Sequence, residues 1–475
     1  MCGIFGTINC KTKDVNRVSE SVNVLVHRGP DEKKVKDFGR VVFGFTRLSI
    51  QDLSENGSQP MTHPKIPIHI VFNGEIYNYK ILKEELLKQG AVFRSTGDTE
   101  VILHAYHAWG WEETLARLEG MFGLALYDEN KGVIYLARDR FGQKPLFYSE
   151  LEGGLIFSSE VKAIVKYCDG ALMDFFSSLN PLFTTGLSPR GKTMFQGILQ
   201  LEEGQYLKYN LNNGQYEKCK YFSIFDWVSQ SRYKELSNCS QSELLDQLDS
   251  AFHDSVQKHL LSDAPLASLF SAGLDSSLIT AIAAKYKAVD LYHFESELHN
   301  YLRYPKFFAE KYNLKLRIEK GNDKNYIFQL PRMIYHYETI NKEEGPVLAN
   351  LCRLARKDGI KAFLTGDSAD EIFGGYPSHQ DFFIALKTLV SALEKAQLTQ
   401  QYPLLSIHYD DPTQQLSAQI QLPSLQPIET MRTQLQQSGW QLRVRSAQEQ
   451  TSGLTLVDVE LSAAGSKKDE EGGTP

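Results

Sequence analysis

The cysteine at position 2 is the residue that most constrains this chain, because it stands directly before an apolar segment, CGIFGTI, that reads as a strand. A secretory signal begins with basic residues and a longer apolar run, and this start has neither. Removal of Met1 gives Cys2 both a thiol and an α-amine, whose pKa near ~8 suits a base at neutral pH. We therefore expect the mature chain to begin at a nucleophilic Cys2. A small buried cysteine entering a first strand is the alternative.

Length and composition indicate a soluble chain of about two or three domains. The net charge of -7 over 475 residues gives no reason to expect nucleic-acid binding. No apolar run approaches the ~18 residues of a membrane span. The six cysteines are scattered without a CxxC pair, which argues against a disulfide framework or a zinc site. We expect a cytoplasmic protein.

Short apolar runs with strand character follow one another through the first third of the chain. Two helical segments interrupt them and end at Gly90 and Gly110. Antiparallel strands with interposed helices predict a layered sandwich.

Polar residues stand where these strands end. The side-chain amide of Asn73 and the backbone N–H of Gly74 can donate hydrogen bonds to an oxyanion, and Arg47 can bind a carboxylate. Glu75 and Asp98 can hold an ammonium group. Each has a plainer interpretation: the Asn73-Gly74 pair makes a good turn, and Asp98 can cap the next helix. Together with a nucleophilic thiol they predict an amide-hydrolysing site for an amino acid.

The order of motifs over residues 1 to about 222 resembles the N-terminal-nucleophile glutaminase half of asparagine synthetases. The segments that carry the resemblance are MCGIFG, HRGPDE, TRLSI, VFNGEIYNY, STGDTEVILHAY, GMFGLALYD and LARDRFGQKPLFY. The resemblance implies an αββα sandwich in which Cys2 attacks the side-chain amide of glutamine and releases ammonia. It also implies a glutamine pocket made of Arg47, Leu48, Ile50, Asn73, Gly74, Glu75 and Asp98.

The middle of the chain begins with a capping box, Ser240 to Glu243, and a helix. We interpret its apolar positions as core: Leu244, Leu248, Phe252, Val256 and Leu260. The strand PLASLF then leads into SAGLDSS, residues 271–277, before another helix. This arrangement suits phosphate binding, because the N–H groups and the helix dipole favour an anion. It is not a Walker A loop, since no GK[ST] follows.

Strands and helices alternate from here to TGDSADE, residues 365–371, which predicts a parallel sheet with ligands at its carboxyl edge. Asp275 and Asp370 could then meet over one Mg²⁺ ion bound to a polyphosphate. A solvated acidic loop is the alternative for the second motif.

These two motifs resemble the pyrophosphate loop and the GxGxDExFGGY stretch of the asparagine synthetase half, a Rossmann-like ATP-pyrophosphatase domain. The resemblance implies ATP binding by Leu269, Ser271, Gly273, Asp275, Ser276, Thr365 and Gly366. It places Asp367 near the acceptor substrate and makes Asp275 and Asp370 the Mg²⁺ ligands. Ala272 replaces the family's second glycine, which could tighten the loop. Pro305 lies in a stretch that the family makes helical, so we expect that helix to be broken or shifted.

The composition changes near residue 383, because residues 397–450 hold as many glutamines, fourteen, as residues 1–396. A helix at 383–398, a hairpin turning at Asp411-Pro412, a second helix and two more strands give the order α-β-β-α-β-β. This tail resembles the ferredoxin-like dimerisation domain of the type II secretion platform protein L, which makes a homodimer conceivable. A shuffled junction near residues 378–396 is the alternative.

We thus expect a glutaminase domain (1–222), an incomplete ATP-binding domain (236–382), a ferredoxin-like α+β domain (383–465) and a disordered tail (466–475). The resemblance implies a carbon–nitrogen ligase that uses glutamine, ATP and a carboxylate, aspartate by family default. Amidation of another carboxylate, such as a uronic acid, is one alternative. A glutaminase whose degenerate second half serves assembly is another, since the family's late basic residue has no visible counterpart and no lysine occurs between Lys395 and Lys467.

Overall fold

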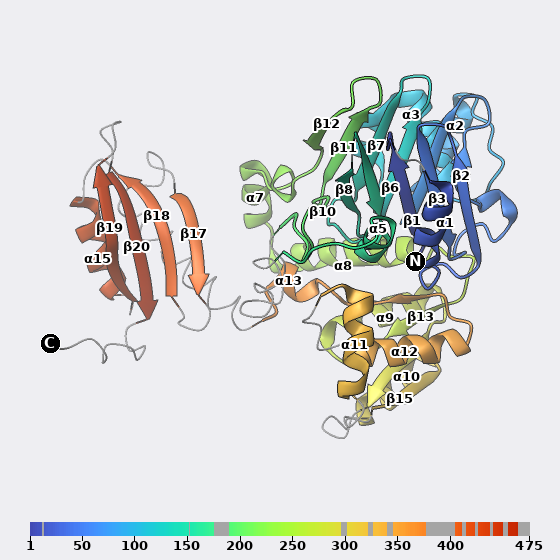
Figure 1. Cartoon of the computed structure of the whole chain (residues 1–475). Coiled ribbons are helices and arrows are strands. Elements are labelled where there is room, and N and C mark those ends of the chain that lie inside the picture. Colours follow the sequence, from blue (N-terminus) through green and yellow to red (C-terminus); the bar gives the residue numbers. More distant parts are fainter. Residues whose placement is uncertain are drawn as a thin grey trace. The chain divides into compact units, whose positions relative to one another are not determined.

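Two six-stranded antiparallel sheets make up the N-terminal part of the chain in the computed structural model (Figure 1). The first sheet has the order β10-β8-β9-β1-β3-β2 and the second the order β12-β11-β7-β6-β5-β4. The strands of the first are β1 (Gly3–Ile8), β2 (Glu32–Asp37), β3 (Val41–Arg47), β8 (Phe147–Leu151), β9 (Gly154–Ser158) and β10 (Ile198–Gln200). Those of the second are β4 (Met61–Thr62), β5 (Ile68–Ile76), β6 (Gly120–Asp128), β7 (Val133–Arg138), β11 (Gln205–Asn210) and β12 (Gln215–Lys220).

The chain divides into two compact units, Met1–Thr365 and Gly366–Pro475, which we describe separately. The structure describes residues 1–11, 14–151, 153–174, 190–295, 302–321, 326–339, 345–376, 404–410, 415–422, 426–437, 440–449 and 455–463. Within the first unit we call residues 1–222 the double-sheet domain and residues 241–364 the parallel-sheet domain.

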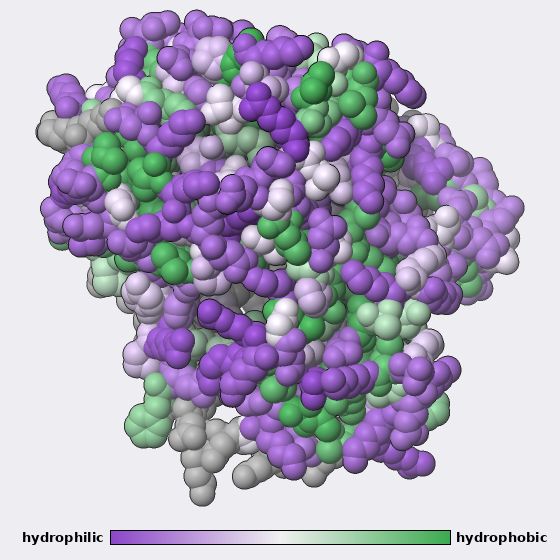
Figure 2. Space-filling model, turned by 90° about the vertical axis from the view of Figure 1, so that its right-hand side faces the viewer, coloured by the Kyte–Doolittle hydropathy of each residue, from purple (hydrophilic) through white to green (hydrophobic). Residues whose placement is uncertain are grey.

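Among the described residues, no helix has both the length and the apolar character that a membrane crossing requires. The face of the molecule in Figure 2 is mostly hydrophilic, and its hydrophobic residues gather only in small patches.

The double-sheet domain has four layers. Its two sheets enclose one hydrophobic core, which includes Phe43 and Phe45 from the first sheet and Leu136 from the second. Helices α1 (Val15–Asn23) and α5 (Val161–Tyr167) pack on the outer face of the first sheet. The outer face of the second is covered by α2 (Tyr79–Lys88), α3 (Thr99–Trp109) and α4 (Trp111–Arg117), and a 3-10 turn, η1 (Glu55–Gly57), precedes β4. The predicted αββα sandwich is confirmed.

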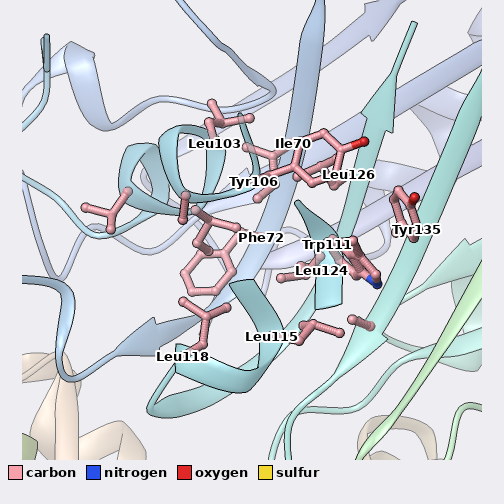
Figure 3. Packing of buried hydrophobic residues seen from close by; sticks show 14 of the residues in the cluster. Ile70, Phe72, Leu103, Tyr106, Trp111, Leu115, Leu118, Leu124, Leu126 and Tyr135 are labelled. Carbon is pink, nitrogen blue, oxygen red and sulfur yellow. The ribbon is translucent and has the colours of Figure 1, made fainter. Parts of the chain in front are cut away.

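Aromatic packing fixes the helical layer to the second sheet (Figure 3). The ring of Trp111, at the start of α4, stacks on Tyr135 of β7 with 4.3 Å between ring centroids. Gly90 and Gly110 follow α2 and α3 with φ of +88° and +82°, a left-handed conformation that glycine adopts at low cost. The two predicted helix ends are confirmed.

A four-stranded parallel sheet with the order β15-β14-β13-β16 forms the parallel-sheet domain. Its strands are β13 (Leu266–Leu269), β14 (Asp290–Glu295), β15 (Leu316–Lys320) and β16 (Ala362–Leu364). Four helices bury apolar residues against these strands: α8 (Gln241–His259), α9 (Leu274–Tyr286), α10 (Arg303–Tyr312) and α12 (Gly345–Lys357). Helix α11 (Tyr326–Tyr337) packs beside α12. The elements η2 (Ile224–Asp226) and α7 (Gln230–Ser237) link the two domains. The predicted parallel sheet is confirmed.

Two details of this domain differ from the sequence-based expectations. The capping box of α8 is present, but Leu244 and Leu248 are 38% and 40% exposed, so their placement in the core is wrong. Only the second half of α8 and the residue that follows it reach the core, through Phe252, Val256 and Leu260. Pro305 falls in the first turn of α10, where a backbone N–H has no helical partner, so the helix runs unbroken from Arg303 to Tyr312. The expected break is wrong, and a shift relative to the family's helix stays a prediction.

The second unit contains a short helix, α13 (Ala369–Phe373), and an antiparallel sheet with the order β17-β18-β20-β19. Its strands are β17 (Leu404–Asp410), β18 (Gln415–Leu422), β19 (Trp440–Glu449) and β20 (Thr455–Ala463). Helix α15 (Gln426–Gln437) buries the predicted stripe of Ile428, Met431 and Leu435 against the sheet. The α+β character of the tail is confirmed for these elements. The expected helix at 383–398, the hairpin tip at Asp411-Pro412 and the tail at 466–475 lie outside the described residues.

Candidate active site

The thiol of Cys2 lies against the backbone of Leu48. Strands β1 and β3 pair so that Gly3 lies opposite Thr46, which brings the residue before β1 to the residue after β3. The Leu48 N–H donates to Cys2 Sγ at 3.5 Å, and the thiol donates to the Leu48 carbonyl at 3.7 Å. Burial raises the pKa of the Cys2 thiol, although the nearby amino terminus opposes this shift. The sulfur therefore needs a base to remove its proton before it can act as a nucleophile.

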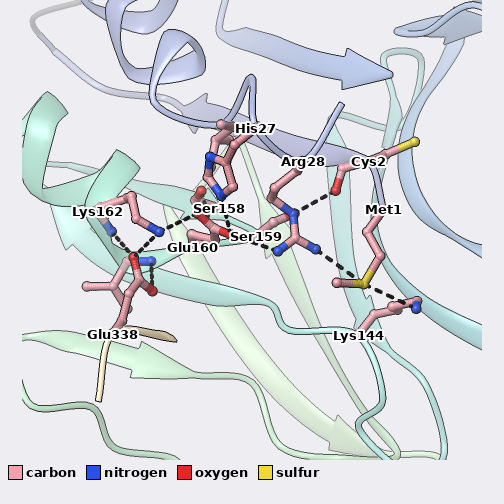
Figure 4. A network of polar contacts seen from close by, with 12 residues as sticks. Met1, Cys2, His27, Arg28, Lys144, Ser158, Ser159, Glu160, Lys162 and Glu338 are labelled. Carbon is pink, nitrogen blue, oxygen red and sulfur yellow. Dashed lines mark hydrogen bonds and ion pairs between the residues drawn. The ribbon is translucent and has the colours of Figure 1, made fainter. Parts of the chain in front are cut away.

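Arg28 fixes the backbone of the candidate nucleophile (Figure 4). Its Nε donates to the Cys2 carbonyl at 2.8 Å, and its Nη1 donates to Glu160 at 2.8 Å. Burial raises the pKa of Glu160, but the hydrogen bond from His27 and the charge of Arg28 outweigh this effect and lower the pKa to about 2. In Figure 4 the Cys2 sulfur points away from this network, so the network orients the main chain and leaves the thiol on the opposite side.

Asn73 and Gly74 lie on β5 beside β6, where Asn73 pairs with Gly123 and Gly74 with Phe122. Asn73 is 1% exposed, and neither its amide nitrogen nor its amide oxygen has a hydrogen-bond partner among the described residues. A Cβ at Gly74 would lie 2.2 Å from the Met121 carbonyl oxygen, so the close strand pairing itself requires glycine there. The alternative of a turn at this pair is wrong, because both residues belong to a strand.

The half-buried Glu75 and the buried Asp98 form an acidic pair. Burial raises the pKa of Asp98 to about 6, and burial together with the charge of Asp98 raises the pKa of Glu75 well above its ordinary value. Two neighbouring carboxylates cannot both ionise easily, so the charge of Asp98 adds to the effect of burial on the pKa of Glu75. The arrangement favours a cationic ligand.

Asp98 occupies the position before α3, but its side chain does not cap that helix. Its Oδ2 instead accepts the backbone N–H of Ile76 at 2.8 Å. The capping alternative is therefore wrong, and the carboxylate is directed towards the strand that carries Glu75.

Arg47 is nearly buried, and its guanidinium is held by the loop that follows β3. Its Nη1 donates to the Ser54 carbonyl at 2.8 Å, its Nη2 donates to the Asp52 carbonyl, and Glu32 lies 4.0 Å away. The orientation of this candidate carboxylate-binding group therefore depends on the conformation of residues 48–54.

Two residues of this neighbourhood escaped the sequence analysis. Arg28 belongs to the segment HRGPD, whose glycine and proline predict a turn and give no sign that the arginine is buried. Lys144 is nearly buried, and desolvation followed by the charge of Arg28 lowers the pKa of its amine to about 8. The carboxyl of Glu75 and the thiol of Cys2 both act on this amine, so the three groups share one electrostatic environment. No local pattern marks Lys144, because its neighbours come from distant segments.

Residues 271–273 of the SAGLDSS segment lie in the turn between β13 and α9, and residues 274–277 begin α9, as expected for an anion-binding loop. Ser271 Oγ accepts the Gly273 N–H at 3.3 Å and lies 2.9 Å from Ser276 Oγ. Ala272, which stands where the family has a second glycine, has a φ of +69°. The substitution therefore falls at a left-handed position, where a Cβ costs about 1–2 kcal/mol.

Thr365 directly follows β16, and β16 lies beside β13, so Thr365 and the SAGLDSS loop share the carboxyl edge of the sheet. Leu269 ends β13, and Asp275 lies in the first turn of α9 with its carboxylate half-buried. Oxygen donors of this kind suit Mg²⁺. Gly366, Asp367 and Asp370 belong to the second unit, so the pairing of Asp370 with Asp275 stays a prediction. Among the described residues, no cluster of three or more His, Cys, Asp or Glu side chains suits a metal ion.

Comparisons with known protein families agree with this division into two sites. The family model described as a glutamine amidotransferase domain matches residues 1–222, and the model described as asparagine synthase matches residues 247–466.

Curated relatives match along most of the chain. "Asparagine synthetase [glutamine-hydrolyzing] 3" of Bacillus subtilis is 33% identical over 411 residues, which cover 79% of this chain and 63% of the relative. "Putative asparagine synthetase [glutamine-hydrolyzing] 1" of Methanocaldococcus jannaschii is 31% identical over 412 residues, which cover 81% of this chain and 70% of the relative. The chain spans only 63%, 60% and 55% of the three Bacillus subtilis relatives that it matches.

A solved structure, the glutamine phosphoribosylpyrophosphate amidotransferase of Bacillus subtilis, superposes with a TM-score of 0.35 at 15% identity. The superposition covers 67% of this chain and 65% of that one. A likeness of this degree carries no weight for the function.

Proposed function

Because the chain belongs to the glutamine-hydrolysing asparagine synthetase family, we propose that it hydrolyses glutamine at Cys2 and passes the ammonia to an activated carboxylate. The first half-reaction converts glutamine and water to glutamate and ammonia. The second converts a carboxylate and ATP to an acyl-adenylate and pyrophosphate, and ammonia then displaces AMP to give the amide. Aspartate is the carboxylate that the family implies.

The observation that supports glutamine hydrolysis most strongly is the buried amide of Asn73. A buried polar group without a partner costs about 1–3 kcal/mol, so a side chain kept in this state suits a partner that arrives with the substrate. The Asn73 amide and the Gly74 N–H would stabilise the oxyanion that forms when the thiol attacks the glutamine amide. The α-amine of Cys2 would take the thiol proton and deliver it to the departing ammonia.

The charged groups fit the two ends of an amino acid. The ionised carboxyl of Asp98, with Glu75 beside it, would bind the α-ammonium group, and Arg47 would bind the α-carboxylate. Leu48 and Ile50 would border the same pocket from the loop after β3.

The carboxyl edge of the parallel sheet would bind ATP. Leu269, Ser271, Gly273, Asp275, Ser276, Thr365 and Gly366 would contact the nucleotide. Asp275 and Asp370 would hold a Mg²⁺ ion, which supplies positive charge against the phosphates, and Asp367 would contact the acceptor.

Three product measurements test the two half-reactions separately. With glutamine alone, the parent chain should release ammonia and Cys2→Ala should not. With ATP, aspartate and an ammonium salt, both chains should form AMP and asparagine at the same rate, because that half-reaction does not use the thiol. Equal ammonia release by parent and Cys2→Ala would exclude the proposed nucleophile.

A further inference from the structure

The loop that follows β3 joins the two domains of the first unit. Residues 48–52 connect the thiol-binding backbone of Leu48 with the carbonyl of Asp52 that holds Arg47. Contacts from the parallel-sheet domain reach this loop, although no residue of that domain entered the predicted glutamine pocket.

Asp263 makes two hydrogen bonds to this loop. Its backbone N–H donates to the Ile50 carbonyl at 3.0 Å, and its carboxylate accepts the Asp52 N–H at 2.9 Å. Asp263 lies two residues before Pro265 and just ahead of β13, at the amino-terminal edge of the parallel sheet. One residue therefore binds the loop through its main chain and through its side chain.

A second contact supports the same loop a few residues earlier. Lys361 Nζ donates to both carboxylate oxygens of Asp31 at 2.8 Å, and Asp31 in turn accepts the Ser49 N–H at 2.8 Å. The Lys361 N–H also donates to the Pro265 carbonyl at 3.1 Å. The residues that precede β13 and β16 thus support the loop together, Asp263 directly and Lys361 through Asp31.

Asp52 transmits this support to the groups that would recognise the substrate. It is a non-glycine residue with a φ of +47°, a conformation that persists only when its surroundings enforce it. Its carbonyl accepts a hydrogen bond from Arg47, and its carboxylate accepts the Thr96 N–H at 2.7 Å, two residues before Asp98. Release of the Asp52 N–H from Asp263 would therefore loosen both ends of the amino-acid pocket.

We propose that Asp263 is a positioning residue for glutamine: the parallel-sheet domain holds the pocket loop in its binding conformation through the Asp263 carboxylate. The inference rests on the proposed glutaminase function and adds a requirement to it, namely that the pocket is complete only when the two domains are in contact.

Steady-state ammonia release from glutamine, measured on the full chain, tests this. Asp263 is exposed, so its substitution leaves core packing intact. In Asp263→Ala we expect the glutamine KM to rise about tenfold while kcat stays within about twofold, because the loop is misplaced but the thiol and oxyanion groups are not. Asp263→Asn keeps an acceptor oxygen for the Asp52 N–H and should restore a KM within about threefold of the parent.

Lys258→Ala is the matched control. Lys258 pairs with Glu119 across the same two domains at 3.0 Å, and within its own helix with Asp254 at 2.8 Å. Its ion pairs thus lie away from residues 48–52, so its removal should leave the glutamine KM unchanged. Lys361→Ala provides a second variant that should raise KM, because it removes the support of Asp31 and Ser49.

The outcomes separate this inference from the proposed function. A parent chain that neither hydrolyses nor binds glutamine overturns both. A parent that hydrolyses glutamine, with an unchanged KM in Asp263→Ala, overturns only the role of Asp263. Equal rises of KM in Asp263→Ala and Lys258→Ala, or no rescue in Asp263→Asn, would also overturn it, because general loosening of the interface would then be the cause.

Discussion

Replacement of Asp98 by asparagine should make the chain more stable at neutral pH and poorer at binding glutamine. The side chain is 5% exposed, and burial raises its pKa to about 6. Asparagine keeps the shape and an acceptor oxygen for the Ile76 N–H, but it removes the buried charge.

The magnitude follows from the shift in pKa. A rise of about two units over the ordinary aspartate value, at about 1.4 kcal/mol per unit, means that the ionised form costs the fold about 3 kcal/mol. Because the folded state holds the proton more tightly, this cost is absent below pH ~4, grows as the pH rises, and is complete above pH ~6. Allowing for imperfect replacement, we expect Asp98→Asn to gain about 2 kcal/mol at pH 7.5, or about 4–8 °C in Tm for a domain of this size.

The assay compares thermal unfolding of parent and Asp98→Asn at pH 4.5 and 7.5. The stabilisation should be present at pH 7.5 and nearly absent at pH 4.5, while the glutamine KM at pH 7.5 rises about 10- to 100-fold through loss of a charged hydrogen bond. In the parent, KM should rise as the pH falls below about 6, since Asp98 is then protonated.

Glu100, in the first turn of α3, provides a control of opposite sign. Burial raises the pKa of Glu100, but the His104 ring 3.6 Å away and the hydrogen bonds from the Ser95 N–H and hydroxyl lower it below its ordinary value. Glu100→Gln should therefore destabilise the chain at pH 7.5. The reasoning is refuted if Asp98→Asn lowers Tm at pH 7.5, or if its effect is the same at both pH values.

Three further substitutions test individual contacts. Gly74→Ala should destabilise the chain by about 3 kcal/mol or more, measured by urea unfolding, because its Cβ would lie 2.2 Å from the Met121 carbonyl oxygen; a near-neutral result would show that β5 and β6 can separate. Ala272→Gly should stabilise the chain by about 1 kcal/mol in the same assay by relieving the left-handed φ of +69°, and a loss of stability would contradict that conformation. Lys144→Met should slow alkylation of the Cys2 thiol near pH 8, because a nearby cation favours the thiolate; an unchanged pH profile of alkylation would place Lys144 outside the electrostatic environment of Cys2.

Local signals in the sequence were sufficient for most of the fold. Gly90 and Gly110 end their helices because each adopts a left-handed conformation that other residues adopt at a cost. The alternation of apolar residues in the tail predicts strands that place one face against α15, and the stripe of Ile428, Met431 and Leu435 supplies the other side of that core.

Other features depend on contacts that no local pattern contains. The apolar spacing of α8 is continuous, but Leu244 and Leu248 lie in its first half, which does not pack into the core, so periodicity overestimates the core. Asp52 and Asp263 are 211 residues apart, and neither is unusual in its own segment. Their hydrogen bond arises from the packing of one domain on the other, which the sequence of either domain does not specify.

The shared loop also limits how this protein can be rearranged. A fragment of residues 1–222 keeps the Cys2 thiol and the Asn73 amide, but at the surface that Asp263 and Lys361 contact it exposes the Asp52 N–H and the Asp31 carboxylate to water. A chimera that joins this fragment to another parallel-sheet domain therefore needs an acceptor at the place of Asp263 and a cation at that of Lys361. The segment that can be exchanged between proteins is therefore larger than the double-sheet domain, and it includes at least the residues that precede β13 and β16.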